Sequence, residues 1–175
     1  MFKIIFLLLL LIAFIITILV LRQPDSFRYA RTQTMNATPG AVFEQVNDLR
    51  KFNEWSPWAK VDPGAKIEFS GPSAGVGAAM SWDGNKDIGA GKMTVIDSKP
   101  NDYVKYRLDF ERPMKSTAES EISITPEGAQ SLVTWSMYGK NTVMGKIVGI
   151  FINCEKMVGD MYSKGLLNLK ATVEK

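Results

Sequence analysis

Few side chains in this chain are of the types that usually carry enzymatic chemistry. Its 175 residues include no histidine and a single cysteine, Cys154. These counts exclude Ser-His-Asp and Cys-His nucleophile systems, a histidine general base, histidine-ligated zinc and sites with several cysteine ligands. No spacing among the aspartates and glutamates pairs two carboxylates for acid–base work. We therefore expect no metal site and no cofactor.

One tyrosine is the best candidate for a proton donor. Tyr106 alternates with Lys105 and Arg107 and falls on the apolar side of its predicted strand, where its hydroxyl could act as an acid on a bound molecule. Arg112, beside Pro113 at the end of that strand, is a candidate for binding an acidic ligand group. Alternation places Arg107 on the outer side, which weakens the same role for it.

The charge balance gives no sign of a nucleic-acid partner. The chain has 21 Lys and Arg against 18 Asp and Glu, a formal net charge of +3. Nucleic-acid proteins normally concentrate basic residues on one face, and no such cluster is present in this sequence. We expect no nucleic-acid partner.

An uninterrupted apolar stretch lies near the N-terminus. Residues 4–21 read IIFLLLLLIAFIITILVL, with Thr17 as the polar exception. As a helix this stretch is about 27 Å long, close to the thickness of a bilayer core. A cleaved signal peptide is the alternative, but its apolar region would be shorter and followed by small residues, whereas Arg22 and Gln23 follow here. We predict an uncleaved single-pass anchor and linker over residues 1–25 and one domain over residues 26–175.

Basic residues give a preference for the side of the membrane that carries the domain. Lys3 precedes the apolar stretch, and Arg22, Arg28 and Arg31 follow it. Since positive charge tends to stay on the cytoplasmic side, this count favours a cytoplasmic domain. Arg28 and Arg31 fall inside a predicted strand, which reduces their weight in the count.

The remaining pattern predicts a strand, two short helices, a run of strands and a long helix. Thr38 and Pro39 are typical of a helix start, and Ser56-Pro57 of a helix end. Gly, Pro, Asn and Asp clusters separate stretches of period two further on. The predicted elements are a strand over 26–35, helices over 39–46 and 48–54, strands over 65–70, 76–83, 89–98, 103–111, 116–125 and 130–139, and a helix over 142–172.

Each predicted strand has one apolar and one polar face. Val104, Tyr106 and Leu108, for example, alternate with charged residues. This is the pattern of a single antiparallel sheet covered on one side, and it argues against a two-sheet sandwich. The helix over 142–172 would be about 46 Å long and carries an apolar stripe, so we expect it to cover the sheet.

This order of elements and several local motifs resemble one known superfamily. The motifs are FNEWSPW at 52–58, GVG at 75–77 before MSW at 80–82, GAG at 89–91, VTWSM at 133–137 and KGLLNLK at 164–170. Over about residues 26–173 the chain resembles the START-like (SRPBCC) superfamily, in its polyketide cyclase/dehydrase-like branch.

The resemblance implies an α+β helix-grip fold, also described as START-like or Bet v 1-like. Its seven-stranded, curved antiparallel sheet would surround the long C-terminal helix, with a ligand cavity between them and one transmembrane helix in front. The resemblance also implies a bacterial protein, placed in the inner membrane by its anchor. It implies no single reaction, because this superfamily mixes carriers, receptors, cyclases and proteins without known ligands.

The inward-facing positions are rich in methionine and aromatic residues. Such side chains suit an adaptable cavity for an apolar ligand, and an ordinary core is the alternative for each of them. The predicted ligand-binding set is Phe69, Met80, Trp82, Met93, Tyr106, Phe110, Trp135, Met137, Phe151, Met157 and Met161.

Four further residues are candidates for a gate. Trp55 and Trp58 flank Pro57 after the short helices, where they would control access to a cavity, contact the membrane interface or pack on the core. Gly145 and Gly149 lie in an apolar helical stretch, where glycine is unfavourable. They indicate either close packing or a helix start that opens.

The sequence thus supports three functional hypotheses. The first is a membrane-tethered binding protein for a hydrophobic small molecule or lipid, held between the sheet and the C-terminal helix. The second is a polyketide cyclase/dehydrase-like enzyme acting on an apolar substrate, with Tyr106 as the acid. The third is an interaction domain whose interior is a closed core.

Overall fold

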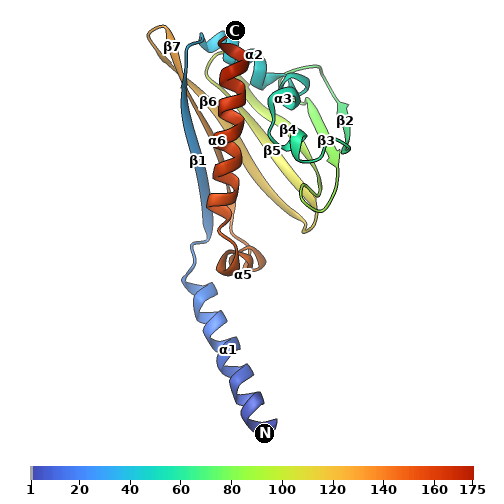
Figure 1. Cartoon of the computed structure of the whole chain (residues 1–175), viewed down its shortest axis with the longest axis vertical. Coiled ribbons are helices and arrows are strands. Elements are labelled where there is room, and N and C mark those ends of the chain that lie inside the picture. Colours follow the sequence, from blue (N-terminus) through green and yellow to red (C-terminus); the bar gives the residue numbers. More distant parts are fainter. Residues whose placement is uncertain (1) are drawn as a thin grey trace.

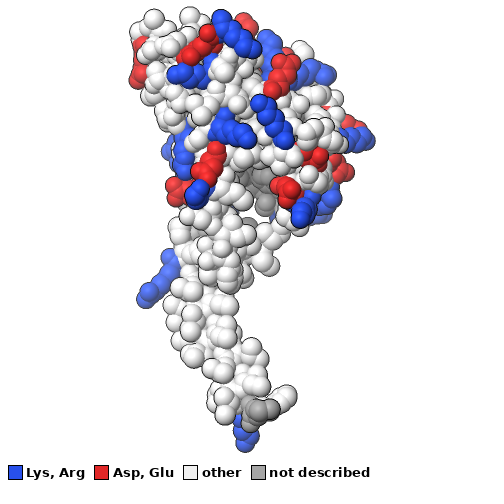
Figure 2. Space-filling view, viewed as in Figure 1, with Lys and Arg blue, Asp and Glu red and all other residues white. Residues whose placement is uncertain are grey.

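The computed structural model describes residues 2–175, a folded domain with one helix extending from it (Figure 1). That helix, α1, spans Phe2–Arg22, and none of its residues is buried against the domain. Its mean hydropathy is 3.6, so by length and composition it can cross a membrane, although a signal sequence has the same properties. Figure 2 shows an uncharged surface along this helix, whereas charges of both signs cover much of the domain.

The domain is built on one antiparallel sheet of seven strands in the order β1-β7-β6-β5-β4-β3-β2. β1 pairs with β7, so the first and last strands lie side by side. This confirms the predicted single sheet and its fold class. The strand bounds are β1 Ser26–Met35, β2 Lys66–Ser70, β3 Ala79–Asp83, β4 Ala90–Lys99, β5 Tyr103–Arg112, β6 Ser116–Glu127 and β7 Gln130–Lys140.

The apolar side chains of the strands lie on the face covered by helices. In β5, Val104 and Tyr106 are fully buried, and in β6 Ile122 is fully buried, whereas Arg107 is exposed. The alternation seen in the sequence therefore identifies the two faces correctly. β6 ends two residues later than the predicted strand over 116–125, because it continues through Glu127.

Three short helices follow β1 and cover one end of this face (Figure 1). α2 spans Pro39–Asn47 and is capped by Thr38, which accepts a hydrogen bond from Ala41 N at 3.4 Å. α3 spans Leu49–Trp55 and α4 spans Trp58–Val61. The first two were predicted, but α4 was not, since Pro57 marks a helix end in the sequence while here it precedes a further turn.

The predicted continuous helix over 142–172 is wrong, because the segment forms two helices. α5 spans Val143–Phe151 and α6 spans Cys154–Val173. Ile152 is extended, with φ −122° and ψ 125°, and the side chain of Asn153 caps α6 by accepting a hydrogen bond from Lys156 N at 2.9 Å. Asn153 therefore starts a new helix inside an apolar stretch, and α5 turns aside toward the end of α1 (Figure 1).

α6 approaches the sheet closely at a glycine. A β-carbon on Gly165 would lie 2.5 Å from Cζ3 of Trp135 and 3.1 Å from Cδ of Pro57. Both neighbours are rigid rings in the core, so neither can move away easily. Glycine at this position lets α6 lie against β7 and the loop that precedes α4.

We expect Gly165→Ala to destabilise the protein by about 1–3 kcal/mol, because overpacking against Trp135 and Pro57 outweighs the better helix propensity of alanine. The free energy of unfolding should be measured by urea denaturation of the full chain in detergent, followed by tryptophan fluorescence. Gly40→Ala is the matched control, since its β-carbon would meet only Asn101 Oδ1, at 3.5 Å. Equal stability of the two variants would contradict the close contact.

Candidate binding cavity

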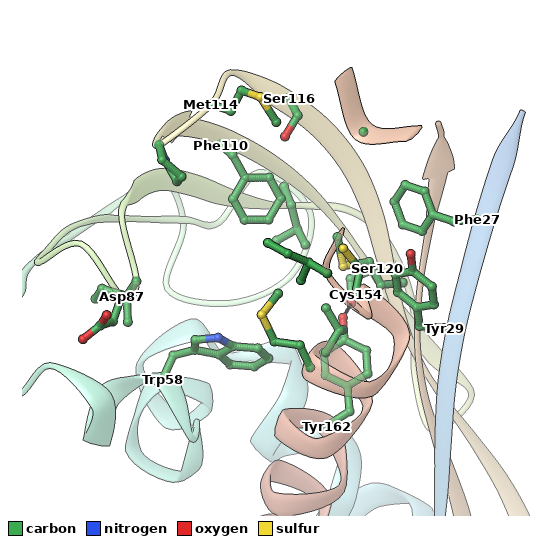
Figure 3. A pocket seen from close by; sticks show the side chains of 18 of the residues that line it. Phe27, Tyr29, Trp58, Asp87, Phe110, Met114, Ser116, Ser120, Cys154 and Tyr162 are labelled. Carbon is green, nitrogen blue, oxygen red and sulfur yellow. Dashed lines mark hydrogen bonds between the residues drawn. The ribbon is translucent and has the colours of Figure 1, made fainter. Parts of the chain in front are cut away.

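A cavity of about 1200 Å³ lies between the concave face of the sheet and the helices α5 and α6. Its wall includes residues of β1, α3, α4, β3, β5, β6 and β7 as well as the two C-terminal helices. Figure 3 shows Phe27, Phe110, Trp58 and Tyr162 around this space. This volume exceeds the range of about 300–1,000 Å³ that is usual for small-molecule sites, so the cavity is large enough for a lipid-sized ligand.

Most of the predicted apolar set lines this cavity. β3, β4, β5 and β7 each contribute inward side chains, and α5 and α6 contribute one each. These residues are Met80, Trp82, Met93, Phe110, Trp135, Met137, Phe151 and Met157. Their contact with a ligand stays a prediction.

Phe69, Tyr106 and Met161 are not among the lining residues. Phe69 is half-buried, and the guanidinium of Arg50 lies 4.4 Å from its ring centroid. Tyr106 is fully buried, and its hydroxyl donates to Val46 O at 2.6 Å. Burial raises the pKa of Tyr106 well above its ordinary value, with a smaller contribution from Tyr162. The hydroxyl of Tyr106 is therefore hydrogen-bonded within the core and is not available to a molecule in the cavity.

The four gate candidates lie in different environments. Trp55 is buried, and its indole N–H donates to Gln45 O at 3.2 Å, so it belongs to the core. Trp58, Gly145 and Gly149 line the cavity. Trp58 meets the ring of Trp135 edge-on, with centroids 5.7 Å apart. The prediction that these residues open and close the cavity stays open.

Trp82 is held flat across its neighbouring strand. It pairs with Gly91 of β4, where a β-carbon would lie 2.5 Å from the indole ring. Its N–H donates to Ile88 O at 3.2 Å, and Phe110 meets the ring edge-on at 5.9 Å between centroids. The absence of a side chain at Gly91 thus lets a large aromatic surface form part of the cavity wall.

A small polar cluster interrupts the apolar wall. Ser120 Oγ accepts from Trp135 Nε1 at 2.9 Å, donates to Ser136 O at 3.0 Å and lies 3.2 Å from the hydroxyl of Tyr162. The Tyr162 ring stacks on Trp135, with centroids 4.1 Å apart and an angle of 8°. Burial raises the pKa of Tyr162, so its hydroxyl stays neutral. This cluster offers a polar contact to a ligand without a charge.

The two arginine candidates separate as alternation predicts. Arg112 lines the cavity, where it pairs with Asp83 and donates to Gly84 O at 3.3 Å. Arg107 does not line it and pairs with Asp109 at 3.0 Å on the outer face. Asp83 already neutralises Arg112, and both side chains are more than half exposed. The pair therefore forms a polar edge of the cavity and not a buried site for an anion.

The acidic residues do not gather into a metal site. Among residues 2–175, no three side chains of the His, Cys, Asp and Glu types come together where they could hold a metal ion.

Sequence reasoning missed several lining residues, including Phe27, Tyr29, Ser120, Cys154 and Tyr162. Phe27 and Tyr29 stack on each other on β1, with centroids 5.0 Å apart. Phe27 and Tyr29 alternate in the sequence as strand residues do. Arg31 and Gln33 follow on the same face, so the sequence does not mark this face as apolar.

Comparison with solved structures identifies the class of fold. The chain is similar to a protein from Chromobacterium violaceum, with 16% identity, a TM-score of 0.60, and 87% of this chain and 99% of that chain covered. It is similar to a protein from Nitrosospira multiformis, with 15% identity, a TM-score of 0.61, and coverages of 84% and 96%. It is also similar to major latex-like protein 151 from Panax ginseng, with 14% identity, a TM-score of 0.58, and coverages of 87% and 100%. These likenesses establish the helix-grip, Bet v 1-like fold.

The family follows from the sequence match over residues 26–174 to the family described as polyketide cyclase / dehydrase and lipid transport. The chain belongs to this family, which confirms the resemblance drawn from its motifs. A search of curated proteins found no match.

We expect Ser120→Ala to destabilise the protein by about 1–3 kcal/mol, because it leaves the buried Trp135 N–H and the Tyr162 hydroxyl without this partner. Ser123→Ala, on the opposite face of the same strand, is the matched control and should change stability by less than about 0.5 kcal/mol. Urea denaturation in detergent measures both. If Ser120→Ala leaves the stability unchanged, the cluster does not hold Trp135 and Tyr162 in place.

Proposed function

We propose that this chain is a membrane-tethered binding protein for a hydrophobic small molecule or lipid. The cavity carries this proposal, because it is large, mostly lined by apolar side chains and open to a neutral polar cluster. Binding would come from apolar area removed from water, worth about 25 cal/mol per Å². The description of the family, which includes lipid transport, agrees with this class of ligand.

The tether is the second part of the proposal. α1 is long and apolar enough to span a bilayer, and the proposal treats it as an uncleaved anchor in the bacterial inner membrane. The ligand would then partition into the same bilayer that holds the protein. The cytoplasmic placement of the domain is also part of the proposal. It rests on the count of Arg22, Arg28 and Arg31 against Lys3, of which Arg28 and Arg31 lie in β1.

The experiment is ligand identification followed by a cavity-filling variant. Native mass spectrometry of the full chain released from detergent should show a bound apolar molecule. Met137→Trp, which fills part of the cavity, should weaken binding of a fluorescent fatty acid or fluorescent sterol by about tenfold or more, equal to about 1.4 kcal/mol.

Met161→Trp is the matched control, because Met161 is also half-buried but does not line the cavity. It should bind the same probes as the unaltered chain. If no apolar molecule copurifies and neither probe binds, the binding proposal fails. If both variants bind equally, the cavity is not the binding site.

The alternative is an enzyme of the cyclase or dehydrase type, which the family description also includes. The polar cluster favours Tyr162 over Tyr106 as the group that would contact a substrate, since Tyr162 lines the cavity and Tyr106 does not. Tyr162→Phe removes this hydroxyl while keeping the ring stacked on Trp135. A carrier would keep most of its affinity in this variant, whereas an enzyme would lose turnover of a bound polyketide substrate.

The cavity volume argues against the third hypothesis, a domain with a closed core.

A further inference from the structure

An apolar surface at the end of the domain next to α1 has no partner within the described residues. We call it the α5 patch. Its side chains are exposed by about half or more, which is unusual for large apolar residues gathered in one place. The patch consists of Val143 (68% exposed), Met144 (52%), Phe151 (74%), Ile152 (48%) and Met157 (57%).

The one charge of this segment is paired with the linker that follows α1. Lys146 is the only charged residue between Val143 and Cys154, yet it is only 9% exposed. Its ammonium lies 2.6 Å from Oδ1 of Asp25, in the linker after α1. The pair lowers the pKa of Asp25 through the hydrogen bond and the charge of Lys146, so the carboxylate is ionised at neutral pH. A helix facing water would expose its lysine and bury its phenylalanine, and α5 does the reverse.

α5 is fixed beside the end of α1. Gln23 Nε2 donates to Lys146 O at 3.0 Å, and Gly149 faces the same glutamine side chain, where a β-carbon would lie 3.2 Å from Oε1. Asn141 adds two bonds to the linker, from Nδ2 to Pro24 O at 3.2 Å and from its backbone N to Asp25 O at 2.8 Å. These contacts hold α5 at the level where the apolar part of α1 ends.

α5 also borders the cavity. Gly145, Val148, Gly149 and Ile150 are lining residues, and so are three residues of the patch, Phe151, Ile152 and Met157. α5 is thus a thin wall between the cavity and the surroundings of α1. On the side seen in Figure 2, the uncharged surface of α1 continues past one basic side chain at its end and onto this end of the domain.

We propose that the α5 patch lies in the surface of the bilayer that α1 crosses, and that α5 forms the entrance through which an apolar ligand passes between bilayer and cavity. The occupant of the patch is lipid, because the patch adjoins the end of α1, contains no charged residue, and the only lysine of α5 is paired with Asp25. An apolar helix at this depth is stabilised by burial among acyl chains and headgroups. The entrance role rests on the proposed ligand binding, and the depth of α5 rests on the proposed membrane anchor.

The depth of α5 can be measured on the full chain in phosphatidylcholine/phosphatidylglycerol nanodiscs. On a Cys154→Ser background, nitroxide labels attached through Val143→Cys and Met144→Cys, neither of them a lining residue of the cavity, should be accessible to oxygen and protected from a water-soluble nickel complex. Val76→Cys and Leu167→Cys are the matched controls, since these side chains are 58% and 56% exposed on other parts of the domain. Their labels should be accessible to nickel. Nickel accessibility at 143 and 144 equal to that of the controls would overturn the proposal.

A kinetic measurement tests the entrance itself. Val143→Ser combined with Met144→Ser changes the patch without altering a lining residue. We expect this double variant to take up a fluorescent fatty acid from its own bilayer about tenfold more slowly, with unchanged equilibrium affinity in detergent. Leu167→Ser should behave like the unaltered chain. Uptake by the double variant at the unaltered rate would overturn the entrance role.

The two proposals fail in different ways. Absence of probe binding by the unaltered chain in detergent would refute the binding function, and the label accessibilities would still decide whether α5 lies in the bilayer. Normal binding together with water-exposed labels would refute the membrane placement of α5 alone.

Discussion

The packing around Trp135 connects the sheet, the helices and the cavity. The indole stacks on Tyr162 of α6 at 4.1 Å and donates its N–H to Ser120 of β6 at 2.9 Å. Gly165 allows α6 to approach the same ring, and Trp58 meets it edge-on. One side chain of β7 therefore sets the distance between α6 and the sheet. It also forms part of the cavity wall, so the stability of the fold and the shape of the site depend on the same contacts.

The cavity exists because the helices cover only part of a wide sheet. α6 packs against β1 and β7, at one side of the sheet, and α2 packs against β5 and β6 at one end. The inward side chains of β3, β4 and the end of β5 are left to face α5 and α6 across a gap. Met80, Met93 and Phe110 lie there, where a closely packed protein would place another helix. A ligand is one way to remove this apolar surface from water.

The sequence predicts the strands and their faces because period-two alternation is a local property. The sequence predicts less well how deeply each side chain is buried. Alternation shows on which face of the sheet a side chain lies, but not what covers that face. Tyr106 and Trp135 both point inward. α2 reaches Tyr106, whose hydroxyl donates a hydrogen bond to Val46 O, whereas Trp135 lies in the cavity wall. For the same reason, Trp58 and Trp82 line the cavity and Trp55 and Phe69 do not. Only tertiary packing decides this difference.

The break between α5 and α6 shows a different limit of sequence reasoning. Residues 143–154 are apolar and helical in pattern, so the cap at Asn153 is hidden by the residues around it. The break has consequences for the whole molecule, because it lets α5 turn out of line with α6 and contact the end of α1. The chain bends at Ile152, and Lys146 meets Asp25 while Gln23 holds the backbone of α5. The linker after α1 and the start of the C-terminal region are thus joined into one unit. This junction, more than the length of α1, brings the wall of the cavity next to the helix that can span a membrane.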